Sequence, residues 1–222
     1  MKKTARKGHC MFKEYIYDPI AKAFRIIFHY TPVYSKHDAS RNVIPVYPSP
    51  FGHITDEHSF FAQIHNFVEY FKNFIELNTG YKLLWDDTKT IPRSEEHVQI
   101  LFKGILDQHC IANNIDFTRE VNQGMGPVDF RFSCGYRNRV LLEIKLAQNT
   151  RFWNGLKKQL PQYMKVDSCQ YGIFLVVVYT DNDMDRIKDI ERIRAETECE
   201  HGVQLKVVIV DARPDTKKSA SK

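Results

Sequence analysis

The pattern of apolar and polar residues in two neighbouring segments predicts a β-hairpin. In residues 128–132, apolar side chains alternate with Asp129 and Arg131, the two-residue period of a half-buried strand. Residues 140–146 are nearly all apolar, which is typical of a central strand covered on both faces. The segment between them, residues 133–138, contains the Gly and Asn of a tight turn.

Apolar residues at three- and four-residue steps predict the helices. The expected helices run from about Glu57 to Gly80, from the N-cap Ser94 to about Cys110, from about Thr150 to Val166, and onward from Thr180. Alternating or continuous apolar runs predict further strands at 23–30, 117–121, 172–179 and 203–210. Pro161 lacks an N–H and is expected to kink or interrupt the third helix. Prolines and a glycine mark residues 42–53 as a loop.

From residue 93 onward the order is helix, three strands, helix, strand, helix, strand. Strand–helix–strand units imply right-handed crossovers, so residues 93–212 are predicted to form an α/β domain with a mixed central sheet flanked by helices. Residues 1–92 are interpreted as an N-terminal extension or small domain, available to a second copy or a partner protein. Residues 213–222, rich in Lys and Ser, are predicted to be a disordered tail.

Composition narrows the class of protein. The 222 residues are 43% hydrophobic and 27% charged, as in an ordinary globular protein, and the net charge of +5 permits a polyanionic partner. The five cysteines lie far apart with no Cys-x-x-Cys pair, which argues against a zinc knuckle and favours a reducing cytoplasm. No apolar stretch is long enough to span a membrane, so no membrane partner is expected.

The candidate chemistry lies on the predicted hairpin. Glu143 and Lys145 share one face of an otherwise apolar strand, where unpaired charges would cost several kcal/mol. With Asp129 on the adjacent strand, the pattern suggests a site for a hard divalent cation and an activated water. The alternative is an exposed ion pair worth at most about 1 kcal/mol, with Asp129 as a turn residue.

Asp129 followed by Glu143-x-Lys145 resembles the signature of the PD-(D/E)xK nuclease superfamily. The preceding Gly-x-Gly-Pro-Val and the later Gln159-x-x-x-Tyr163 are similar to its RecB-type and lambda-exonuclease-like branch. The resemblance spans residues 94–211 and implies a restriction-endonuclease-like αβββαβ core.

The resemblance also implies a ligand set. Asp129, Glu143 and the Ile144 carbonyl would hold Mg²⁺ or Mn²⁺, and Lys145 would orient the attacking water or stabilise developing negative charge. Glu95 would assist a second ion, since it lies at the edge of the apolar stripe of its helix whereas Glu96 points away. The alternative for both glutamates is complementation of the helix dipole.

The helix at 150–166 carries the expected contacts to nucleic acid. In the resembled branch, the positions of Gln159 and Tyr163 lie against the nucleic acid near the metal ions. Arg151, Lys158 and Lys165 form a neighbouring basic stripe suited to phosphate contacts. Ordinary helix packing and solvated surface are the alternatives for these two groups.

These observations together predict a metal-dependent nuclease that hydrolyses phosphodiester bonds of DNA, in phage defence, restriction or DNA repair. RNA remains an alternative substrate. The alternative from another class is a non-catalytic nucleic-acid-binding or assembly module that retains the fold. The sequence contains no Walker loop, and its Gly124-x-Gly126 leads into a strand and not into a helix, which argues against a dinucleotide site.

Overall fold

The computed structural model describes residues 4–6, 9–18, 23–32, 56–122 and 127–214, and it describes the side chains of residues 56–119 and 128–214. The chain forms two compact units, Met1–Val46 and Tyr47–Lys222. The predicted loop at 42–53 and the glycines Gly124 and Gly126 lie outside the described residues.

The first unit contains a three-stranded antiparallel sheet in the order β1-β2-β3. Its strands are β1 (Thr4–Arg6), β2 (His9–Asp18) and β3 (Ala23–Pro32). The strand predicted at 23–30 is therefore confirmed, whereas β2 had no counterpart among the predicted elements.

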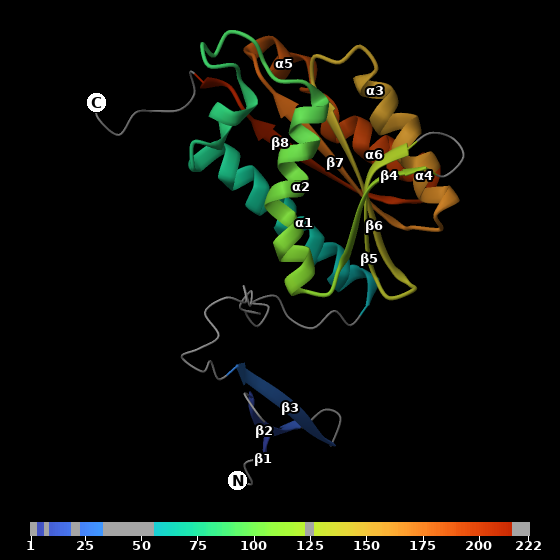
Figure 1. Cartoon of the computed structure of the whole chain (residues 1–222). Helices are drawn as coiled ribbons and strands as arrows, with labels where there is room; N and C mark the ends of the chain where they lie inside the picture. The colour runs from blue at the N-terminus through green and yellow to red at the C-terminus, as the bar shows by residue number, and fades with distance from the viewer. Residues whose placement is uncertain (1–3, 7–8, 19–22, 33–55, 123–126, 215–222) are drawn as a thin grey trace. The chain divides into compact units, whose positions relative to one another are not determined.

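The second unit is built on a five-stranded sheet in the order β4-β5-β6-β7-β8 (Figure 1). The strands are β4 (Asp116–Asn122), β5 (Pro127–Cys134), β6 (Asn138–Leu146), β7 (Tyr171–Val178) and β8 (Gln204–Asp211). The first three strands pair antiparallel, and β6, β7 and β8 pair parallel. The predicted α/β class with a mixed central sheet is confirmed, and β6 is its central strand.

Helices cover both faces of this sheet (Figure 1). On one side lie α1 (Glu57–Leu77), the short helix η1 (Gly80–Leu84) and α2 (Glu95–Ala112). On the other lie α3 (Phe152–Asn154), η2 (Gly155–Gln159), α4 (Leu160–Val166), α5 (Asp181–Arg186) and α6 (Ile190–His201). The face alternation of β6 explains this arrangement, because Leu142 and Ile144 belong to the first core and Leu141 to the second.

The boundary between the units differs from the predicted one near residue 92. Phe60, Phe67 and Phe71 on α1 are fully buried in the core that α1 shares with α2 and the sheet. The Phe-rich stripe of this helix buries a large apolar area against the sheet, which places residues 57–92 with the second unit.

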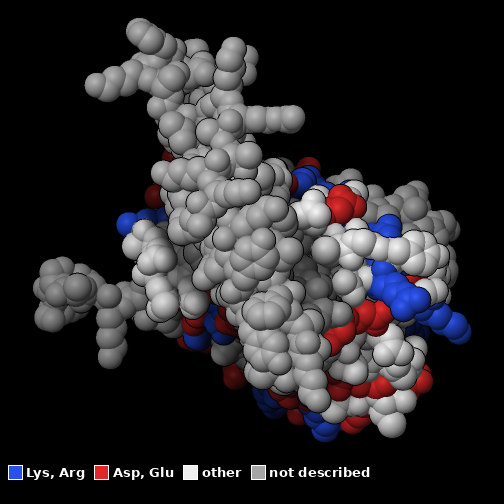
Figure 2. Space-filling view, turned by 90° about the horizontal axis from the view of Figure 1, so that it is seen from below, with Lys and Arg blue, Asp and Glu red and all other residues white. Residues whose placement is uncertain are grey.

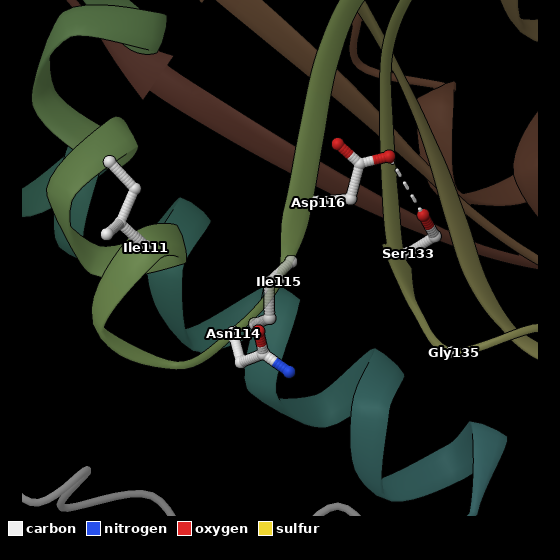
Figure 3. A pocket seen from close by; sticks show the side chains of 6 residues that line it. All are labelled: Ile111, Asn114, Ile115, Asp116, Ser133 and Gly135. Atoms are coloured by element: carbon white, nitrogen blue, oxygen red, sulfur yellow. Dashed lines mark hydrogen bonds between the residues drawn. The ribbon is translucent and has the colours of Figure 1, made fainter.

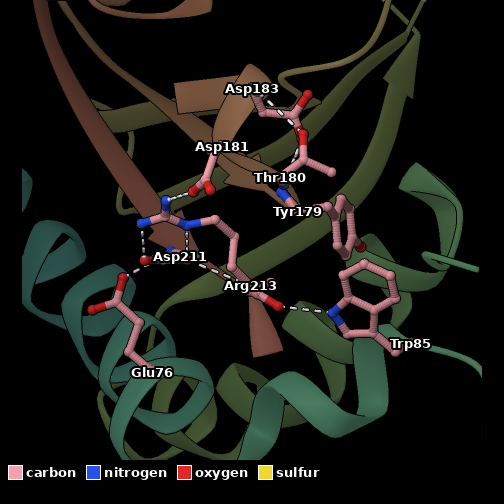
Figure 4. Close-up of polar contacts among 9 residues, drawn as sticks. Glu76, Trp85, Tyr179, Thr180, Asp181, Asp183, Asp211 and Arg213 are labelled. Atoms are coloured by element: carbon pink, nitrogen blue, oxygen red, sulfur yellow. Dashed lines mark hydrogen bonds and ion pairs between the residues drawn. The ribbon is translucent and has the colours of Figure 1, made fainter. Parts of the chain in front are cut away.

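Polar contacts tie the end of β8 to α1 and to the segment that precedes α2 (Figure 4). The Trp85 indole N–H donates to the Ala212 carbonyl at 2.7 Å, and the Asp211 N–H donates to Glu76 Oε1 at 2.8 Å. Arg213 pairs with Asp211 at 2.8 Å and also with Asp181. Arg213, predicted to belong to the disordered tail, is thus bound to the end of β8, and residues 215–222 of that predicted tail lie outside the described residues.

Pro161 interrupts the regular helix without breaking it. The helix continues from α3 through a single π-helical turn, η2, into α4, with the Leu160 N–H bonded to the Gly155 carbonyl five residues earlier. In a regular helix, residue 161 would donate to the Lys157 carbonyl, which proline cannot do. That carbonyl instead lies 3.2 Å from His201 Nε2 of α6. The wider turn and this contact compensate for the missing N–H.

Among the described helices, none combines the length and the apolar character needed to cross a membrane.

Candidate active site

The site forms where the antiparallel pairing of β5 and β6 ends. The ladder runs from Cys134–Asn138 to Phe130–Leu142, so that Asp129 and Glu143 come next in register. Asp129 replaces the missing backbone pairing with its side chain, since its Oδ2 accepts the Ile144 N–H at 2.7 Å. Both carboxylates are therefore brought to the same place at the end of the ladder.

Lys145 links the carboxylates of the cluster. Its Nζ lies 2.9 Å from Glu143 Oε1 and 2.8 Å from Glu95 Oε1. Glu143 is 3% exposed and Lys145 is 8% exposed, so the exposed ion pair considered above does not describe them. The second oxygen of Glu143, Oε2, is buried and has no hydrogen-bond partner among the described residues.

Glu95 reaches the cluster from the first residue of α2. Ser94 caps this helix by accepting the His97 N–H, as predicted, which sets the direction in which Glu95 points. Glu95 Oε2 accepts from Asn149 Nδ2 at 3.2 Å and from the Leu146 N–H at 3.4 Å. Glu96 is exposed. The helical phase thus separates the two glutamates in the way that the sequence predicts.

Burial of these charges shifts their proton equilibria. Burial and the neighbouring Glu143 carboxylate raise the pKa of Asp129 to about 7. Burial also raises the pKa of Glu143, against the opposing effect of Lys145. For Lys145, burial lowers the pKa, but the carboxylates of Glu143 and Asp129 and the hydrogen bond to Glu95 outweigh it, and its pKa is raised. Three carboxylates share one ammonium, so the cluster lacks positive charge.

A divalent cation would supply the positive charge that the cluster lacks. Asp129 and Glu143 offer carboxylate oxygens, and the buried, unpartnered Glu143 Oε2 is an acceptor that an ion would satisfy. Ile144 adds a third oxygen, because the N–H and C=O of one strand residue point to the same edge and its N–H is bound to Asp129. Within the described ranges, no three His, Cys, Asp or Glu side chains surround a common position. Glu95 itself is bound to Lys145 and the turn after β6, and not aimed at the other two carboxylates.

The π turn contributes a close approach to Lys145. A Cβ on Gly155 would lie 3.2 Å from Lys145 Cγ and 3.1 Å from the Phe174 ring, both tighter than ordinary contact. A side chain at this position would therefore displace Lys145 or Phe174. The sequence reasoning missed Gly155 and Asn149, since neither stands out without the contacts that surround it.

Of the five predicted nucleic-acid contacts, Tyr163 lies near the cluster, Gln159 is half-buried, and the three basic residues lie on the surface. Tyr163 is 5% exposed, and both burial and the Glu143 carboxylate raise its pKa, which places the phenol near the acidic cluster. Gln159 Oε1 is buried without a hydrogen-bond partner in the described structure. The basic side chains, by contrast, are exposed: Arg151, Lys158 and Lys165.

A pocket on the surface lies apart from this cluster. A pocket of about 530 Å³ opens where the end of α2 meets the turn between β5 and β6, and Asp116 and Ser133, which hydrogen-bond at 3.3 Å, are among its lining residues (Figure 3). None of the candidate site residues lines it.

Figure 2 shows acidic and basic side chains interspersed over the described surface of one face. This mixed pattern does not by itself indicate a polyanionic partner.

The fold and the site define an α/β protein with a buried carboxylate–lysine cluster at the end of a β-ladder. The chain belongs to the family described as "Domain of unknown function (DUF8371)", whose model matches residues 60–181. The matched range runs from α1 to the first residue of α5 and contains every candidate site residue named above. No curated protein and no solved structure matches the chain.

Proposed function

We propose that this protein is a metal-dependent nuclease that hydrolyses phosphodiester bonds of DNA. The observation that carries the proposal is the convergence of Asp129 and Glu143 at the end of the β5–β6 ladder, with Lys145 beside them. The resemblance of these residues to the PD-(D/E)xK signature supports it. The order of one helix, three strands, a helical segment and a strand, from α2 to β7, agrees with the core that the resemblance implies.

The proposed cofactor is Mg²⁺ or Mn²⁺, held by Asp129, Glu143 and the Ile144 carbonyl. A bound divalent cation supplies positive charge for the phosphate and lowers the pKa of a water. Lys145 keeps its proton and offers a fixed positive charge for the negative charge that develops on the phosphate oxygens. Glu95 orients the Lys145 ammonium.

The helix after β6 supplies the proposed substrate contacts. Tyr163 offers a hydroxyl near the cluster, and Gln159 offers a side-chain amide one helical turn earlier. Arg151, Lys158 and Lys165 are exposed and able to reach phosphates. The described cysteines Cys110, Cys134, Cys169 and Cys199 are unpaired, which supports the reducing cytoplasm as the proposed compartment.

The test is incubation of the purified protein with linear, circular and single-stranded DNA and with RNA, in Mg²⁺, Mn²⁺, Ca²⁺ or EDTA. Cleavage of DNA in Mg²⁺ or Mn²⁺ and none in EDTA is expected. Ca²⁺ should support binding better than hydrolysis, because its looser coordination positions the attacking water less well. Cleavage that persists in EDTA would overturn the metal dependence. Binding without cleavage of any substrate would favour the non-catalytic module, and cleavage of RNA alone would change the substrate.

The two glutamates at the start of α2 provide a matched comparison. Glu95→Gln is expected to reduce turnover about 10- to 100-fold, because Glu95 orients Lys145 whereas Glu96 faces solvent. Glu96→Gln should cut at nearly the wild-type rate. Single-turnover cleavage of a DNA fragment measures both variants. Equal rates would mean that the contact between Glu95 and Lys145 plays no part in the reaction.

A further inference from the structure

Asn149 lies in the turn between β6 and α3 and uses both ends of its side-chain amide. Its Oδ1 accepts the Arg151 N–H at 2.9 Å, two residues further along the chain. Its Nδ2 donates to Glu95 Oε2 at 3.2 Å. The first contact shapes the turn that begins the helical segment, and the second joins this turn to α2.

The backbone of the turn is itself held in place. The Asn149 N–H donates to the Leu146 carbonyl at 2.9 Å, and the Asn149 carbonyl accepts the Phe152 N–H at 3.1 Å. Arg186 of α5 donates to the carbonyls of Gln148 and Asn149 at 3.0 Å and 2.9 Å. The amide of Asn149 is therefore presented to Glu95 by a fixed backbone.

We propose that Asn149 is a positioning residue for the Glu95–Lys145 pair. Glu95 has two oxygens with different partners: Oε1 faces Lys145 Nζ, while Oε2 is held by Asn149 and, at 3.4 Å, by the Leu146 N–H. Without the amide donor, the longer backbone contact alone would hold Oε2, and the carboxylate could rotate away from Lys145. The effect on catalysis rests on the proposed function, whereas the effect on the Glu95 carboxylate does not.

Substitution of Asn149 by Asp separates positioning from turn formation. Aspartate has the same shape and accepts the Arg151 N–H equally well, since both residues favour this kind of turn. It replaces the amide donor with a carboxylate that faces Glu95. If the only role of Asn149 were to form the turn, Asn149→Asp would leave kcat unchanged. We expect it instead to lower kcat about 10- to 100-fold with little change in KM, the loss usual for an outer-shell partner.

Gln148→Glu is the matched control, because it adds the same charge at the neighbouring, exposed position of the same turn. It should leave the cleavage rate within about twofold of wild type and the melting temperature nearly unchanged, as surface substitutions usually do.

Thermal unfolding without nucleic acid or metal tests the contact independently of activity. Asn149→Asp should lower the melting temperature by about 2–4 °C in the wild-type background. In the Glu95→Gln background the loss should shrink or vanish, because the glutamine amide can donate to the new carboxylate. Such non-additivity would support the positioning contact even for a protein that cleaves no substrate. Absence of cleavage would overturn only the proposed function. Additive melting shifts, or wild-type kcat in Asn149→Asp, would overturn the inference.

Discussion

Replacing Asp129 with asparagine is expected to abolish cleavage and, at neutral pH, to stabilise the metal-free protein. The amide retains an oxygen that accepts the Ile144 N–H, so the end of the ladder can keep its geometry. It removes a negative charge that a divalent cation requires, and turnover should fall by more than about 100-fold, the upper range for an outer-shell partner.

The stabilisation follows from the raised pKa of the Asp129 carboxyl. Burial, and next the Glu143 carboxylate, move this pKa from an ordinary value of 3.8 to about 7. The folded state therefore binds the proton more tightly than the unfolded state does. Between pH 4 and pH 7, ionisation of this carboxyl makes the metal-free wild-type protein less stable as the pH rises, and its contribution reaches the order of 4 kcal/mol once the pH exceeds the folded pKa.

Asparagine carries no charge at any of these pH values. The difference in melting temperature between Asp129→Asn and wild type should thus be near zero at pH 4 and largest above pH 7, measured in EDTA by thermal unfolding. Saturating Mg²⁺ or Mn²⁺ should stabilise the wild type alone, by about 2.7 kcal/mol at 100 times the dissociation constant. A variant that is destabilised at pH 8, or that still cleaves, would contradict this account of the site.

Lys145→Met is expected to abolish cleavage as well, but with the opposite effect on stability. Methionine keeps most of the side-chain volume and removes the ammonium that lies between Glu143 and Glu95. Removing one partner of a buried ion pair typically costs about 3–5 kcal/mol at neutral pH, because it leaves a buried charge uncompensated.

The loss should decrease at acidic pH, since the raised pKa of Glu143 allows this carboxyl to take up a proton. Lys165→Met, on the exposed side of α4, is the control and should melt close to the wild type. Circular dichroism melts at pH 5 and pH 8 measure the difference. If Lys145→Met were as stable as Lys165→Met at pH 8, the ammonium would not be the counter-charge of the cluster.

The sequence predicts the elements of the second unit well, because burial on one or both faces imposes a regular apolar pattern. The apolar run of β6 and the alternation of β5 are visible without a structure, and so is the phase that separates Glu95 from Glu96. The same reasoning grouped α1 with the N-terminal segment, since periodicity shows that a helix has an apolar face but not which surface covers it.

The contacts that complete the site cannot be predicted from the pattern of apolar residues. Asn149 meets Glu95 across 54 positions of sequence, and no local pattern signals a polar contact at that separation. Pro161 illustrates the same limit: the missing N–H predicts a disturbance, but the π turn depends on space around Lys157 and on His201 from another helix. Gly155 is informative only once Lys145 and Phe174 are seen to pack against it.

The parallel pairing of β6 with β7 has a consequence for the nascent chain. Glu95, Asp129, Glu143 and Lys145 all leave the ribosome before β7, yet β6 needs β7 as its parallel neighbour, with Lys145 in register with Val176. The turn that carries Asn149 likewise depends on β7 and α5, through the bond from the Ala147 N–H to the Val177 carbonyl and through Arg186. A ribosome-bound chain that stops short of β7 therefore holds every residue of the cluster but lacks the strand that fixes their arrangement.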